Sequence, residues 1–155
     1  MPQVPASLTR AIRLLYAVVA WSGLTALLTV LFSDDLVLSW AKGNRAARQI
    51  LDEGGLDALK ASSINIPGFV PLAIVLFVVF AALAGVLVVF LRAGHGWARA
   101  TLTATVAFSA FAAVVSLGRD LPGLFVAVSV VMLGLYAALL FFLWHKDSSA
   151  YFKAF

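Results

Sequence analysis

The stretch that decides the fold is IPGFVPLAIVLFVVFAALAGVLVVFL, which runs from Ile66 to Leu91 and contains no Asp, Glu, Lys, Arg or His. A helix needs roughly 20 mainly apolar residues to cross the hydrocarbon layer of a bilayer. The run is uniformly apolar and does not alternate in polarity, which disfavours a strand of a membrane barrel. The sequence therefore predicts a transmembrane helix over residues 66–91.

Three further runs of the same kind surround it, over residues 14–32, 97–117 and 121–144, and the only charged residue or histidine in them is Arg99, near the start of the run over residues 97–117. Charged residues make up 12% and apolar residues 63% of the chain, against roughly 25% and 45–50% in soluble domains. The first run ends in FSDD without a cleavage site for a signal peptidase, so we expect it to be retained. The prediction is an all-α membrane protein, with residues 1–155 forming a single integral membrane domain of four transmembrane helices.

The connections between the runs predict the topology. Residues 92–96 and 118–120 are short links, which favour antiparallel neighbours and an up-down bundle. Arg13, Arg92, Arg99 and Lys146 lie at the ends of runs on the side of the two termini. Because cytoplasmic loops of membrane proteins are enriched in Lys and Arg near the spans, we expect both termini in the cytoplasm and the protein in the cytoplasmic (inner) membrane.

The loop over residues 33–65 is long enough to have a structure of its own. The segment SDDLVLSWAKGNRAARQILDEGG predicts a helix that Ser33, Asp34 or Asp35 caps and that the glycine pair at 54–55 ends. Trp40 and Leu51 fall on one apolar face, and a second short helix is expected over residues 56–62. This extracytoplasmic amphipathic helix would either lie in the lipid interface or pack as a lid on the ends of the bundle.

The chain offers little material for catalysis or metal binding. It has no cysteine and two histidines, His95 and His145, whereas a catalytic zinc site usually needs three protein ligands. The eleven Lys and Arg residues are scattered between apolar runs, and a nucleic-acid-binding protein needs them on one face. We therefore expect no enzyme activity, no cofactor, no metal and no nucleic-acid partner.

Two local patterns remain as candidate contact sites. In GHGWAR, residues 94–99, the glycines suit a tight reversal, Trp97 suits the interfacial aromatic belt, and Arg99 is expected to extend toward lipid headgroups. In the third run, Thr101, Thr105 and Ser109 recur every four residues. Such small and hydroxyl-bearing residues pack helices together, either within this chain or against another subunit.

GHGWAR and the segment WHKDSSAYF, residues 144–152, also carry a resemblance. The chain resembles the small four-helix integral membrane proteins of actinobacteria whose function is unknown. The resemblance implies a fold and supplies no catalytic or binding residue.

Two functions follow as expectations. The leading one is a non-enzymatic accessory or stabilising subunit of a membrane complex, or a homo-oligomer, whose partners are membrane lipids and other subunits or itself. The alternative is a lipid or hydrophobic small-molecule binder or carrier, with the 33–65 loop as a lid over a cavity between helices.

Overall fold

The chain is helical throughout the part that the computed structural model describes, residues 3–154, where no strand occurs. Four of its helices are long and apolar enough to cross a membrane, judged by length and composition: α1 (Ala6–Leu31), α4 (Phe69–Arg92), α5 (Gly96–Leu117) and α6 (Gly123–Leu143). The predicted all-α membrane protein is confirmed at this level. The first of these helices begins eight residues before the predicted run and therefore includes Arg10 and Arg13.

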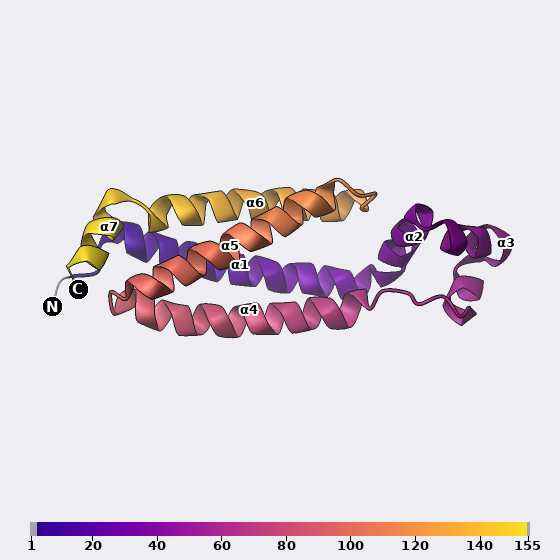
Figure 1. Ribbon diagram of the computed structural model, residues 1–155, viewed down its shortest axis with the longest axis horizontal. Helices are drawn as coiled ribbons and strands as arrows, with labels where there is room; N and C mark the ends of the chain where they lie inside the picture. Colours follow the sequence, from indigo (N-terminus) through magenta and orange to yellow (C-terminus); the bar gives the residue numbers. More distant parts are fainter. Residues whose placement is uncertain (1–2, 155) are drawn as a thin grey trace.

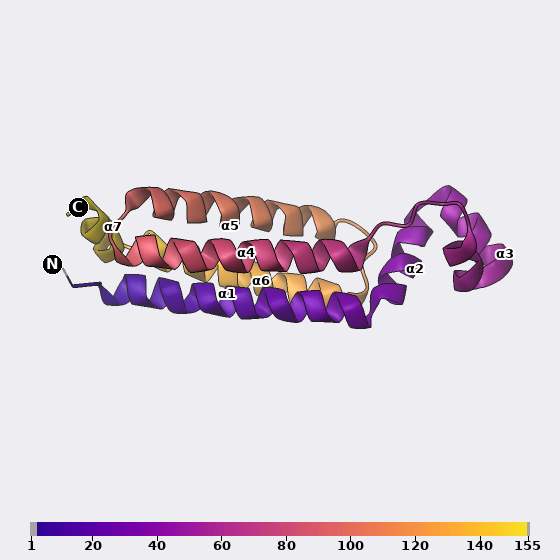
Figure 2. The same ribbon diagram turned by 90° about the horizontal axis from the view of Figure 1, so that it is seen from below.

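The four long helices lie side by side in one elongated bundle (Figure 1). The chain reverses direction between them, and α1 and α5 lie on opposite sides with α4 and α6 between them (Figure 2). α1 packs against both α4 and α6, and α5 packs against the same two helices. Both termini lie at one end of the bundle, here called the termini end, and α2 and α3 project from the other, here called the lid end (Figure 1).

The main core fills the termini half of the bundle. Its fully buried leucines come from all four long helices: Leu8, Leu15, Leu87, Leu91, Leu102, Leu139 and Leu143. Large side chains on the outer faces are exposed, among them Val89 and Phe141, each with 65% of its surface accessible. An apolar exterior of this kind suits a helix bundle whose solvent is lipid.

A short helix that the sequence did not predict closes the termini end. This helix, α7 (Lys146–Lys153), folds back against α1 and α6. The buried Ser148 hydroxyl lies 2.8 Å from the Ser7 hydroxyl, and it donates to the Phe142 carbonyl at 2.9 Å. Because buried hydroxyls need partners, these bonds fix α7 to α1 and to the end of α6.

The external loop forms two helices, α2 (Ser33–Gly43) and α3 (Arg45–Ala61), here together called the lid. The prediction of one helix across residues 33–55 is wrong at Asn44, which is extended and whose Oδ1 accepts from the amides of Ala46 and Ala47 at 3.1 and 3.2 Å. Asparagine is a strong N-cap residue, so it starts a new helix here. α3 then kinks at Gly55, where φ is 74°, close to the predicted end.

The predicted cap of the first lid helix is also corrected. α2 follows α1 after a single residue, Phe32, and no side chain caps its first turn. An N-cap side chain needs an extended residue before the helix, and the nearly continuous chain leaves none. Asp34 instead forms an ion pair with Lys60 at 2.6 Å, which joins α2 to α3.

Candidate functional site

A hollow lies between α4 and α5 at the lid end of the bundle. α5 runs obliquely, close to α4 at the termini end and close to α6 at the lid end (Figure 1). Where α4 and α5 diverge, there is a cleft of about 630 Å³. Small-molecule sites usually measure about 300–1,000 Å³. The cleft is lined by Thr29, Leu36, Phe69, Leu72, Ala73, Leu76, Phe108, Phe111, Ala112, Val115, Ser116, Arg119, Leu121 and Phe125.

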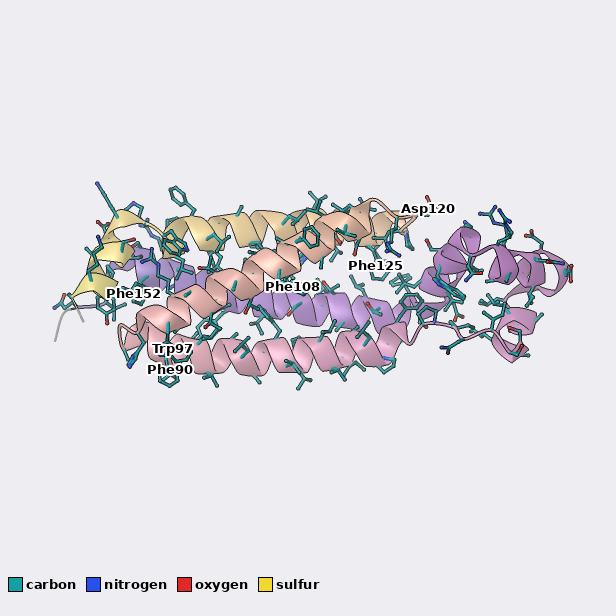
Figure 3. All side chains as sticks on the ribbon, in the orientation of Figure 1. Phe90, Trp97, Phe108, Asp120, Phe125 and Phe152 are labelled. Atoms are coloured by element: carbon teal, nitrogen blue, oxygen red, sulfur yellow. The ribbon has the colours of Figure 1, made fainter. Side chains whose placement is uncertain are left out.

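This cleft is apolar and opens sideways. Phe108 and Phe111, on its α5 wall, are 74% and 67% exposed, and Figure 3 shows Phe108 on α5 and Phe125 farther toward the lid end. The Thr29 hydroxyl is already used, because it donates to the Thr25 carbonyl at 2.9 Å. A molecule in this cleft would therefore contact mainly hydrocarbon and aromatic surfaces.

The depth of the cleft matches one leaflet of a bilayer. Phe108 precedes the end of α5 at Leu117 by nine residues, which is about 14 Å of helix at 1.5 Å per residue. Half of a hydrocarbon layer of about 30 Å is about 15 Å. The cleft therefore extends from the lid end to about the middle of the predicted span.

A second pocket, of about 450 Å³, lies between the lid and the turn that joins α5 to α6. It is lined by Leu36, Ser39, Trp40, Gly43, Asn44, Phe69, Arg119, Asp120 and Leu121. Four of these residues, Leu36, Phe69, Arg119 and Leu121, also line the apolar cleft. The two hollows are therefore adjoining parts of one site, here called the lid-end cleft, with an apolar lower part and a polar upper part.

The upper part carries unpaired charge. Arg119 and Asp120 are exposed neighbours in the turn after α5, and within residues 3–154 neither side chain makes an ion pair or a hydrogen bond. The Oδ1 atom of Asn44 is occupied by the cap of α3, whereas its amide nitrogen remains a donor. The upper part thus offers a guanidinium, a carboxylate, an amide donor and the indole of Trp40 to a polar group.

The two lid residues that the sequence singled out, Trp40 and Leu51, both pack against the small core of the lid, and only Trp40 also lines the cleft. Trp40 lines the upper part of the lid-end cleft. Leu51 does not line it and packs inside the lid with Val37, Ala47 and Leu59. The apolar face of the lid helices is thus largely used for a small core between α2 and α3.

Two of the three hydroxyls in the seam of α5, those of Thr105 and Ser109, have partners within the chain. Thr105 donates to the Thr101 carbonyl at 2.9 Å, and Ser109 forms a side-chain hydrogen bond with Tyr136 of α6. All three seam residues are half-buried, and none lines the lid-end cleft. The seam therefore serves packing between helices of the same chain.

At the termini end, the expectation for Arg99 is wrong. Its side chain is only 8% exposed and does not extend outward. The guanidinium lies 3.8 Å from the centre of the Trp144 ring and donates to the Ser149 hydroxyl at 2.7 Å. Because α7 folds over this end of the bundle, Arg99 is enclosed by residues of the segment WHKDSSAYF.

Trp97 lies at the surface, in the first turn of α5 together with Arg99. It is 49% exposed, and its ring centre lies 4.7 Å from that of Phe90; Figure 3 shows the two rings together. Within residues 3–154, neither His95 nor His145 belongs to a group of three or more His, Cys, Asp or Glu side chains that could hold a metal ion. His145 pairs instead with Asp147 at 3.3 Å.

Comparisons of the chain with models of protein families, with curated proteins and with solved structures gave no match. The resemblance to the small actinobacterial proteins stays a prediction. Its two motifs, however, meet in space, since Arg99 of GHGWAR contacts Trp144 and Ser149. What the protein does must be inferred from the chemistry of its own residues.

Most of the residues that line the apolar cleft were not predicted as site residues. Their signal is weak, because phenylalanine and leucine on a transmembrane helix look alike whether they face a cleft or bulk lipid. Arg119 was the one accessible clue, as a cation in the short link between two spans, with Asp120 beside it.

Proposed function

We propose that this multi-pass membrane protein is a non-enzymatic binder or carrier of an amphiphilic lipid, with the lid-end cleft as its site. The observation that carries the proposal is an apolar cleft of about 630 Å³ that continues into a polar pocket beneath the lid. The two parts suit the two ends of an amphiphile: an acyl chain between α4 and α5, and a headgroup under α2.

The two parts contribute differently to binding. Lipid tails are as apolar as the cleft wall, so an acyl chain gains little free energy by leaving the bilayer. Contacts with the Phe108, Phe111 and Phe125 rings therefore select the shape of the acyl chain, and the polar groups at Arg119 determine the preference for a headgroup. A headgroup that leaves water for the pocket requires partners there, and the pocket provides them.

The predicted orientation places this site on the outer side. If the cation-rich termini end faces the cytoplasm, the lid projects away from the cytoplasm. The cleft then takes its acyl chain from the outer leaflet, through the side opening between α4 and α5.

The leading expectation from the sequence, an accessory subunit or a homo-oligomer, remains a second proposal. It was motivated by the seam of Thr101, Thr105 and Ser109, and the hydroxyls of Thr105 and Ser109 already have partners within the chain. The lid-end cleft therefore carries the stronger argument. A partner protein, if there is one, would have to use another face of the bundle.

The proposed function is tested with a substitution that fills the cleft. Ala112 lines the cleft and is exposed, so Ala112→Phe occupies the space without disturbing the core at the termini end. The full chain is purified in mild detergent and titrated with a diacylglycerol that carries a pyrene-labelled acyl chain, and energy transfer from tryptophan reports binding. We expect saturable binding that Ala112→Phe weakens at least about tenfold, a typical cost of overpacking.

Ala107→Phe is the matched control. Ala107 is also an exposed alanine of α5, but it does not line the cleft. Its replacement should leave the affinity within about twofold, since an exposed substitution away from the site has little effect. Non-saturable partitioning of the probe, or equal loss in the two variants, would refute the proposal.

A further inference from the structure

We infer that the lid-end cleft selects a zwitterionic phospholipid, one whose headgroup carries a phosphate next to the glycerol and an ammonium group beyond it. The inference rests on the proposed function and adds the class of headgroup. It follows from the order in which the site presents its groups and from the balance of charge in its upper part.

The order of the groups runs from the apolar part outward. Arg119 lines both parts of the cleft and therefore lies at their junction, whereas Trp40 and Asp120 line only the upper part. Figure 3 places Asp120 at the extreme lid end of α5 and α6, beyond Phe125. A phospholipid presents acyl chains, then phosphate, then ammonium, which is the same order as cleft, Arg119 and Asp120.

Arg119 suits the phosphate. Its planar guanidinium presents parallel N–H donors that match two phosphate oxygens. The guanidinium is free for this contact, because it forms no ion pair within residues 3–154. Asn44 lines the same pocket, and its side-chain amide is a further donor.

Asp120 and Trp40 suit the ammonium. A carboxylate attracts the positive charge of an ammonium group and accepts hydrogen bonds from the N–H groups of ethanolamine, and an indole face attracts a cation within about 6 Å of the ring. Trp40, on α2 of the lid, is half-buried, and Asp120 is exposed in the turn between α5 and α6; both residues line the pocket.

The charge balance argues against an anionic headgroup. The upper part carries one positive and one negative side chain, Arg119 and Asp120. Lys60, another cation of the lid, is already paired with Asp34 at 2.6 Å. A lipid with a net negative charge would place its phosphate and Asp120 in the same small pocket with one cation between them, which is unfavourable.

The experiment compares headgroups on one set of acyl chains. Dioleoyl phosphatidylethanolamine, phosphatidylcholine, phosphatidylglycerol and phosphatidic acid each displace the pyrene-labelled diacylglycerol from the full chain in mild detergent. We expect the two zwitterionic lipids to displace the probe at a concentration about tenfold lower than the two anionic lipids do, the size of one charge-assisted contact.

Two variants test the roles of the charged residues. Arg119→Gln should remove most of the advantage of every phospholipid over unlabelled diacylglycerol. Asp120→Asn should weaken the binding of phosphatidylethanolamine and strengthen the binding of phosphatidylglycerol, so that the two lipids bind with similar affinity. Arg45→Gln and Asp57→Asn remove the same charges from exposed lid positions outside the cleft and should leave the preference unchanged.

The outcomes separate the two proposals. If the diacylglycerol binds and Ala112→Phe abolishes its binding, but anionic lipids displace it as well as zwitterionic ones do, the headgroup inference fails and the proposed function stands. The headgroup inference also fails if Asp120→Asn lowers the affinity for both classes equally. If the diacylglycerol does not bind at all, the proposed function fails and this inference fails with it.

Discussion

Replacement of Arg99 by alanine should release α7 from the end of the bundle. The guanidinium joins α5 to α7 through a hydrogen bond of 2.7 Å to Ser149 and a cation–π contact of 5.3 Å with Phe152. It also stacks at 3.8 Å on Trp144, at the end of α6. The first two contacts exist only when α7 is docked, so their loss in the variant shifts the equilibrium between docked and undocked α7.

The size of the effect follows from the two contacts that reach α7. A hydrogen bond from a charged donor contributes about 1.5 kcal/mol at the lower end of its range, and a long cation–π contact contributes about 0.5 kcal/mol. Their loss costs about 2 kcal/mol, which corresponds to about a 30-fold larger fraction of undocked α7. The buried Nε of Arg99 lacks a partner, and its removal offsets part of this cost.

Hydrogen exchange of the full chain in detergent, followed by mass spectrometry of the peptide that covers residues 146–153, measures the undocked fraction. Exchange in α7 should accelerate by about 10-fold to 30-fold in Arg99→Ala, while the middle of α6 should not change. Arg92→Ala is the matched control, because it removes an exposed cation at the same end and keeps the carbonyl that accepts from Tyr151. Unchanged exchange in Arg99→Ala, or equal acceleration in Arg92→Ala, would show that Arg99 does not hold α7.

Two further predictions concern stability. Ser148→Ala leaves the Ser7 hydroxyl and the Phe142 carbonyl without a side-chain partner and should lower the free energy of unfolding, measured by SDS titration, by about 1–3 kcal/mol. Ser116→Ala is the control, because the Ser116 hydroxyl bonds only to its own helix, and it should behave like the original protein. Equal midpoints for all three proteins would contradict the prediction. Gly55→Ala should destabilise the lid by about 1–3 kcal/mol, because φ of 74° and ψ of −170° are nearly reserved for glycine. Hydrogen exchange over residues 45–61 should rise in this variant. Gly43→Ala is the control: Gly43 is the last residue of α2 and has open space at its Cβ, so exchange over residues 45–61 should be unchanged or slower.

Much of the architecture could be predicted because hydrophobicity acts locally. A run such as residues 66–91 is long enough for a membrane and has no charge, so its helix follows from the need to satisfy backbone hydrogen bonds in lipid. The break near Gly55 was signalled in the same way, by a glycine pair. The break at Asn44 had a signal too, an N-cap residue, but the strong helical pattern on both sides concealed it.

The errors about Arg99 and the unpredicted helix α7 arose where residues distant in sequence meet. Arg99 was expected at the membrane surface because a cation at the end of an apolar run usually extends outward. The segment that encloses it lies about fifty residues later, and Ser149 reaches it only because α6 returns the chain to the same end. No local pattern in either segment indicates this contact.

By itself, the sequence indicated that this protein is built for a lipid environment, and it indicated the number of apolar spans and the short links between the last three, because these depend on the composition of continuous segments. The lid-end cleft was decided only by the tertiary structure. It exists because α5 crosses from α4 to α6 (Figure 1), and a crossing angle depends on how side chains of different helices fit together. The same angle places Arg119 where apolar cleft and polar pocket join, and so converts an ordinary charged turn into a candidate headgroup site.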